Sequence, residues 1–165
     1  MNTKKLFTLT AVLNLVSALA CLATLLAAIL IINGYYVQSG EEQAAEDAGE
    51  AVGIVVMMIV LLPFAILFLF PSTAASFILH LVASISFFKA TKIGKEMRKS
   101  GVIIRLVFRI LFAIAILFGA FTFGVVADVF AKYLTYIIFA LAAAGAVLPL
   151  VATAFEFIAL KNNNV

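Results

Sequence analysis

The sequence predicts an all-α membrane protein with four transmembrane helices, and three observations lead to this fold class. Hydrophobic residues make up 66% of the chain and charged residues 12%, with a mean hydropathy of +1.25. Soluble domains are about 45–50% apolar and about 25% charged. The charges are also unevenly placed: five of the eight acids lie in residues 41–50, and seven of the eleven bases lie in residues 89–109.

Long uncharged runs supply the helices. A helix needs about 20 apolar residues to cross a bilayer, and an uncharged run of about 18 is a candidate. Residues 6–38, 51–88, 110–127 and 133–155 contain no Asp, Glu, Lys or Arg. These runs leave no room for a soluble catalytic domain. We expect one membrane domain over residues 1–165, with spans at about 6–32, 51–75, 104–127 and 133–157.

The first run has some features of a removable signal peptide. Basic residues precede it, and the small residues of Ser17-Ala18-Leu19-Ala20-Cys21 resemble a cleavage site. The apolar run nevertheless continues to Ile32, whereas a signal core has only about 7–15 residues. We therefore expect the first helix to be retained and to enter an acidic outer loop at 33–50.

The second run leaves one crossing and two crossings open. Pro63 and Pro71 divide residues 51–88 into halves that are each nearly long enough to span. Cytoplasmic loops are rich in Lys and Arg, and only four spans with both termini inside place the basic segment 89–103, Lys4, Lys5 and Lys161 together there. We predict one long, proline-kinked second helix that crosses once and continues as an interfacial or cytoplasmic extension. Two full crossings are the alternative.

The last two runs form a hairpin, because only residues 128–132 separate them. In a hairpin centred near residue 130, positions whose numbers sum to about 261 lie at equal depth. Arg105 and Glu156 satisfy this sum. We predict an ion pair between Glu156 and Arg105, or Arg109 if its side chain reaches down.

The basic segment predicts contact with anionic lipid headgroups, because long basic side chains lay their stems on apolar surface and extend their charges to phosphate. The residues expected to make these lipid-phosphate contacts are Lys89, Lys92, Lys95, Arg98 and Lys99.

A narrow polar stripe follows Pro71. Thr73, Ser76, His80 and Ser84 are spaced by three, four and four residues, which places them on one helical face. An ionisable residue inside a membrane is a candidate functional group, so one hypothesis is that His80 senses protons or binds a metal. The competing interpretation is a neutral imidazole bonded to Ser76 or Ser84. Asn14, in the first run, is interpreted as an interhelical hydrogen-bonding residue.

Small residues recur at spacings of four, which allows helix backbones to approach closely in lipid. The three sets are Ala20, Thr24 and Ala28; Ala120 and Gly124; and Ala140 and Ala144 beside Gly145.

No phosphate-binding loop, nucleophile elbow, zinc motif or cysteine cluster occurs in the sequence. We therefore expect no enzyme, no cofactor, no metal site and no nucleic-acid partner. The expected function is that of an accessory, regulatory or interaction subunit of the cytoplasmic cell membrane, acting through helix contacts with a membrane-protein partner or with itself. The alternative is a small transporter or channel subunit that uses the polar stripe around His80.

Overall fold

The computed structural model describes residues 3–38, 48–93 and 99–163; its described side chains are 4–32, 60, 63, 66–90, 100–125, 133 and 135–161. The secondary structure of these residues is helical throughout. It comprises α1 (Thr3–Gln38), α2 (Ala48–Ile93) and α3 (Lys99–Asn163).

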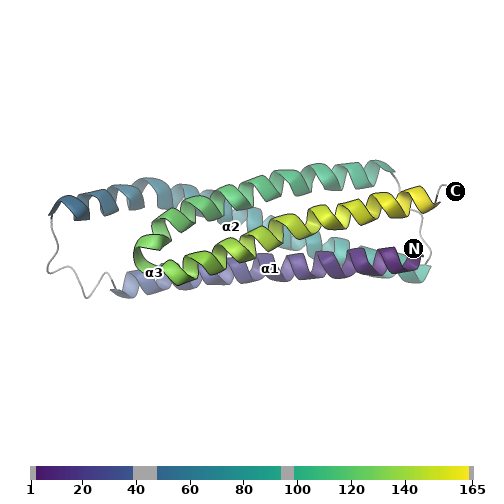
Figure 1. Ribbon diagram of the computed structural model, residues 1–165, viewed down its shortest axis with the longest axis horizontal. Helices are drawn as coiled ribbons and strands as arrows, with labels where there is room; N and C mark the ends of the chain where they lie inside the picture. The colour runs from purple at the N-terminus through teal and green to yellow at the C-terminus, as the bar shows by residue number, and fades with distance from the viewer. Residues whose placement is uncertain (1–2, 39–47, 94–98, 164–165) are drawn as a thin grey trace.

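The third helix reverses direction, so three helical elements give four segments that are long and apolar enough to cross a membrane (Figure 1). The segments are Lys4–Ile32 on α1, Ile66–Ala90 on α2, and Ser100–Val125 and Thr135–Lys161 on α3. We call the last two the first arm and the second arm of α3. The chain remains helical through the reversal at residues 126–134. The sequence predicted a short polar connection at this place.

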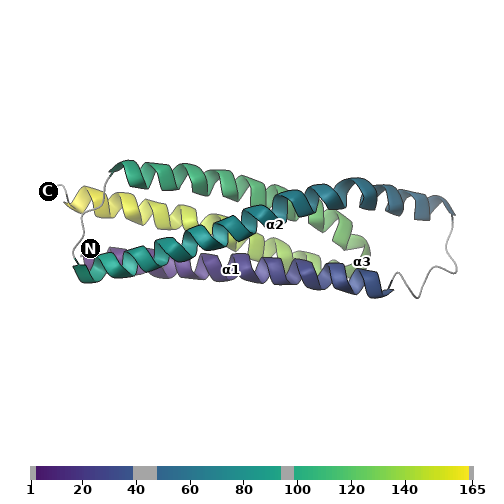
Figure 2. The same ribbon diagram turned by 180° about the vertical axis from the view of Figure 1, so that it is seen from behind.

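The segments run alternately up and down. The start of α1, the end of α2 and both ends of α3 lie at one end of the molecule, and the reversal of α3 lies toward the other (Figures 1 and 2). This arrangement is the one expected for four antiparallel crossings joined by short connections.

The distribution of side chains is inverted relative to that of a soluble bundle. Large apolar residues such as Leu30, Leu67 and Ile114 are more than 60% exposed, whereas fourteen of the described polar or charged side chains are buried. On α1 the buried polar residues recur at alternating spacings of four and three, as expected for the inward face of a helical bundle. They are Thr10, Asn14, Ser17 and Thr24, with Cys21 in the same register. An apolar exterior around a polar core suits a bilayer, where polar groups must find partners inside the protein.

The second helix passes through Pro63 and Pro71 without ending. Its amino-terminal part extends past the other segments, and its later part crosses the bundle obliquely to lie beside the start of α1 (Figure 2). Proline is tolerated in a membrane helix when nearby hydroxyls bond to carbonyls around it. The hydroxyls of Ser72 and Thr73 donate to the Phe68 and Leu69 carbonyls.

The second span was predicted at 51–75. Most side chains of residues 51–65 lie outside the described part, and the span-like segment found among described residues is Ile66–Ala90. The residues that follow Pro71 pack within the bundle: Phe87 lies 6.0 Å from Phe7 of α1, centroid to centroid. The predicted acidic loop, 33–50, has no described side chains.

The backbones of α2 and the first arm of α3 approach each other closely at Gly119. A Cβ atom added to Gly119 would lie 2.6 Å from the Leu69 backbone nitrogen and 2.8 Å from its Cα. Such short distances to backbone atoms can be relieved only by moving a helix. Leu69 itself is fully buried and belongs to the main apolar cluster with Ile116 and Phe123. Glycine at position 119 therefore permits this crossing.

We predict that Gly119→Ala lowers the free energy of unfolding in detergent by about 1–3 kcal/mol, because overpacking separates α2 from α3. The matched control is Gly101→Ala, whose added Cβ would meet the Arg105 side chain at an ordinary 3.6 Å. The control is expected to be neutral or slightly stabilising, because alanine is the better helix former. Thermal melting of the two variants measures the difference, and equal melting temperatures would contradict the close approach.

Candidate functional site

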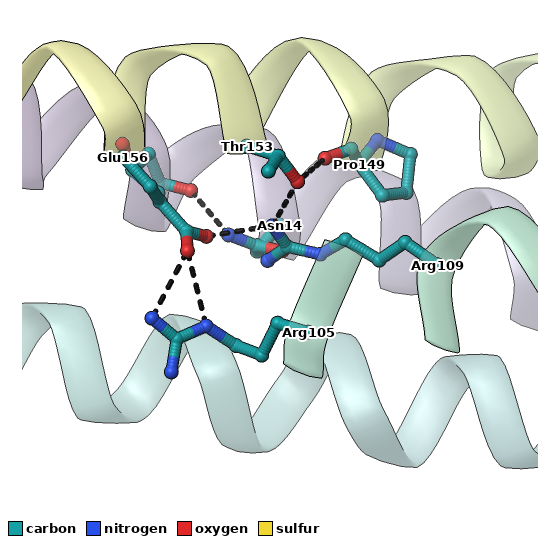
Figure 3. A network of polar contacts seen from close by, with 7 residues as sticks. Asn14, Arg105, Arg109, Pro149, Thr153 and Glu156 are labelled. Carbon is teal, nitrogen blue, oxygen red and sulfur yellow. Dashed lines mark hydrogen bonds and ion pairs between the residues drawn. The ribbon is translucent and has the colours of Figure 1, made fainter. Parts of the chain in front are cut away.

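The buried carboxylate of Glu156, on the second arm of α3, receives two arginines from the first arm (Figure 3). Arg105 Nε donates to Glu156 Oε2 at 3.0 Å, and Arg105 Nη2 lies 3.0 Å from the same oxygen. Arg109 Nη1 lies 2.6 Å from the other oxygen, Oε1. The structure thus brings both predicted arginines to Glu156, one on each carboxylate oxygen.

Arg109 also links this ion pair to α1. Its Nη2 donates to Asn14 Oδ1 at 2.8 Å, and its Nη1 donates to the Thr153 hydroxyl. In Figure 3 the guanidinium lies between Glu156 and the side chains of Asn14 and Thr153. Asn14 is held in turn by its amide, which donates to the Thr10 carbonyl at 2.8 Å. The network therefore joins α1 to both arms of α3.

The two arginines differ in depth. Arg105 precedes Arg109 by about one helical turn, toward the end of the bundle that carries the termini, and its side chain is 30% exposed. The Arg109 and Glu156 side chains are both fully buried. Arg109 lies nine residues into the first arm, which is about 13 Å of helix. One arginine thus reaches the edge of the network while the other is enclosed.

Charge burial of this kind is costly unless the charges are paired. A charged group deep in a membrane costs several kcal/mol, and it is tolerated when it faces the protein interior and finds a partner there. Removing one partner from a buried pair leaves the other charge uncompensated, at about 3–5 kcal/mol. Two guanidinium groups face one carboxylate, so the network carries excess positive charge, and Arg105 is the member exposed enough to reach solvent or headgroups.

We predict that Glu156→Gln lowers the free energy of unfolding in detergent by about 3 kcal/mol or more, because Arg109 loses its counter-ion in the core. Adding Arg109→Met should recover much of the loss. The matched control is Arg105→Met, which should cost less than about 1 kcal/mol, because a partly exposed ion pair contributes little. Melting curves of the variants measure these changes, and an unchanged melting temperature for Glu156→Gln would contradict the pairing.

A second interhelical contact compensates for a proline. Pro149 has no N–H, so the helix cannot satisfy the Gly145 carbonyl four residues earlier. The Ser17 hydroxyl of α1 donates to this carbonyl at 3.1 Å and supplies the missing bond. The two helices are in contact here, because a Cβ on Gly145 would lie 3.0 Å from the Cys21 sulfur and 3.7 Å from the Cys21 backbone nitrogen. The Pro149 carbonyl in turn accepts a 2.9 Å bond from Thr153, which continues to Arg109.

We predict that Ser17→Ala destabilises the protein by about 1–2 kcal/mol, because the buried Gly145 carbonyl loses its substitute donor. In a Pro149→Ala background, where the backbone N–H of residue 149 returns, the same substitution should cost much less. A double-mutant cycle measured by thermal unfolding isolates this coupling. Additive effects of the two substitutions would show that Ser17 does not compensate for the proline.

The predicted polar stripe on α2 faces the bundle interior. Thr73, Ser76, His80 and Ser84 are all at most 2% exposed. Ser84 donates to the Ala11 carbonyl of α1 at 2.9 Å, and Ser76 hydrogen-bonds with the Cys21 side chain. Thr73 bonds only to carbonyls of its own helix. His80 Nδ1 has no hydrogen-bond partner among the described residues.

The predicted lipid-phosphate contacts are mostly outside the described side chains. The Lys89 side chain is described and exposed, whereas the side chains of Lys92, Lys95, Arg98 and Lys99 lie outside the described part. At the same end of the molecule, the Arg105 guanidinium stands 5.4 Å above the centre of the Phe87 ring. The exposed side chains of Lys4, Lys5 and Lys161 lie close to the chain termini at this end.

Sequence reasoning missed three members of the site. Thr153, Thr10 and the Ser17 contact to Gly145 were not predicted. The signal that could have found two of them is the alternating four and three spacing of Thr10, Asn14, Ser17, Cys21 and Thr24. A polar face with this period in an otherwise apolar run indicates the side of a helix that faces protein.

The site offers a fixed arrangement of hydrogen-bond donors and one carboxylate inside a bundle. No group of three or more His, Cys, Asp or Glu side chains able to hold a metal occurs within the described part of the chain. No known protein family model, curated protein or solved structure matches this chain. The class of protein therefore follows from the fold and the site alone. It is an all-α, multi-pass membrane protein of four helical segments with a charged network in its core.

Proposed function

We propose that the protein is a non-enzymatic accessory or interaction subunit of the cytoplasmic cell membrane, which binds a membrane-protein partner or a second copy of itself through α3. The observation that carries this proposal is the outward position of one small-residue pair. Ala20, Thr24 and Ala28 are buried, as are Ala120 and Gly124. Ala140 is instead exposed, and Ala144 is partly exposed.

Larger side chains flank this pair on the same face of the second arm. Tyr136 is 61% exposed and Val147 is 51% exposed. Between them, Ala140 and Ala144 form a stretch of small side chains on the helix surface. Helix association in lipid depends on close packing, and small residues four apart let two backbones approach. A partner helix of matching small residues would fit this stretch.

The proposed orientation rests on charge. Lys4, Lys5, Lys89, Arg105 and Lys161 all belong to the end of the bundle that carries the termini, and the lysines are exposed. Basic residues next to membrane spans are retained on the cytoplasmic side. Both termini are accordingly proposed to be cytoplasmic, with this basic end on anionic headgroups.

We predict that Ala140→Ile and Ala144→Ile reduce association by about tenfold or more, because a branched side chain prevents close backbone approach. The matched control is Ala154→Ile, an exposed position on the same arm. Co-purification of a stoichiometric partner from detergent, or single-molecule counting of copies in liposomes, measures association. Equal association of all three variants and the unaltered protein would contradict an interface at this stretch.

Transport is the second candidate, and a specific observation favours it: His80 is a buried ionisable group with an unpaired nitrogen in the bundle core. Flux of protons or small ions across proteoliposomes that disappears in His80→Ala would support transport. A stoichiometric partner without flux would support the accessory role instead.

A further inference from the structure

Three buried polar atoms in the core have no hydrogen-bond partner among the described residues: Thr10 Oγ1, His80 Nδ1 and Arg109 Nε. They come from three different elements, α1, α2 and α3. Each parent residue is at most 2% exposed. Buried polar groups are almost always hydrogen-bonded, and each one left unpaired costs about 1–3 kcal/mol. Three such atoms in one bundle call for a ligand that can bond to them.

Hydrogen bonds between the helices place these atoms along one seam. Ser84 bonds to Ala11 and Ser76 to Cys21, so His80, midway between the two serines, lies beside α1 near residues 14–17. Arg109 bonds to Asn14, which belongs to the same layer.

The third atom belongs to the neighbouring layer. Thr10 precedes Asn14 by one turn, and its backbone carbonyl accepts a hydrogen bond from the Asn14 amide. The three atoms are therefore spread over about one to one and a half turns, roughly 6–8 Å along the bundle.

The three atoms differ in whether they donate or accept hydrogen bonds, but none of them bonds to another. Arg109 Nε–H is a donor only, a neutral imidazole nitrogen is a donor or an acceptor, and a hydroxyl is both. A molecule that both donates and accepts joins such a set, and a buried water typically makes about three hydrogen bonds to groups of this kind.

We propose that internal water occupies the seam between α1, α2 and α3 and connects His80 to Thr10 and to the Arg109 guanidinium. Through Arg109 the water joins His80 to the Glu156 network. The site depends on neither proposed function, because it rests on the unpaired atoms and their placement alone.

The experiment uses the fact that His80 is the one histidine of the chain. With ¹⁵N-histidine, the full protein in lipid bilayers gives the imidazole signals of a single residue. We expect rapid magnetisation transfer from water to the His80 ring in solid-state NMR, with Nδ1 showing the ¹⁵N shift of a hydrogen-bonded nitrogen. A ring that receives no transfer from water, with Nδ1 at the shift of an unbonded nitrogen, would overturn the proposal.

Thr10→Val supplies a second test, because the change in thermal stability that it causes has opposite signs in a dry and a wet seam. If the seam is wet, the variant removes one of three water ligands and should lower both thermal stability and water transfer to His80, the latter by about a third to a half. If the seam is dry, removing an unpaired hydroxyl should raise stability and leave the ring signal unchanged.

The matched control is Thr24→Val. Thr24 is also fully buried on α1, but its hydroxyl donates to the Ala20 carbonyl at 2.8 Å. This variant should leave water transfer to His80 unchanged. A loss of transfer equal to that of Thr10→Val would contradict the placement of water beside Thr10.

Discussion

The full burial of one carboxylate, Glu156, organises the rest of the bundle. Lipid offers no solvation to a charge, so Glu156 must be neutralised from within the protein. Arg109 supplies its enclosed counter-ion, and Arg109 also donates to Asn14 and Thr153. One charge therefore fixes the relative depth of α1 and both arms of α3. The network meets the cost of the buried Glu156 and Arg109 charges with partners on other segments.

The same requirement governs the backbone. Pro149 leaves the Gly145 carbonyl without its helical donor, and Ser17 of α1 provides one. Gly119 allows α2 to approach α3 closely, while the Ser76 and Ser84 hydroxyls connect α2 to α1. The hydrophobic effect does not hold helices together in lipid, so close packing and interhelical hydrogen bonds set how they associate. The register of this bundle thus follows from polar contacts and from the positions where glycine permits close packing.

Much of the fold could be predicted from the sequence, because crossing a bilayer requires long uncharged runs and the positions of lysine and arginine indicate sidedness. Hairpin geometry predicted that Glu156 pairs with Arg105, or with Arg109 if its side chain reaches down, and the structure has both contacts. The packing of residues 66–90 against α1 could not be deduced from length, since an uncharged run of 38 residues fits several placements. Thr153 and Ser17 were missed for a different reason: their partners lie 44 and 128 residues away, and nothing local to either residue indicates which segment it will face.

The central claim is that the chain crosses the membrane four times and thereby encloses its charged network. Topology reporters fused after residues 45, 95, 130 and 165 test this claim most directly. Four crossings predict that the fusions after 95 and 165 report the cytoplasm, and that those after 45 and 130 report the opposite side. A fusion after residue 95 on the same side as one after residue 45 would contradict a single crossing by α2 and the enclosure of Arg109 and Glu156 within the bilayer.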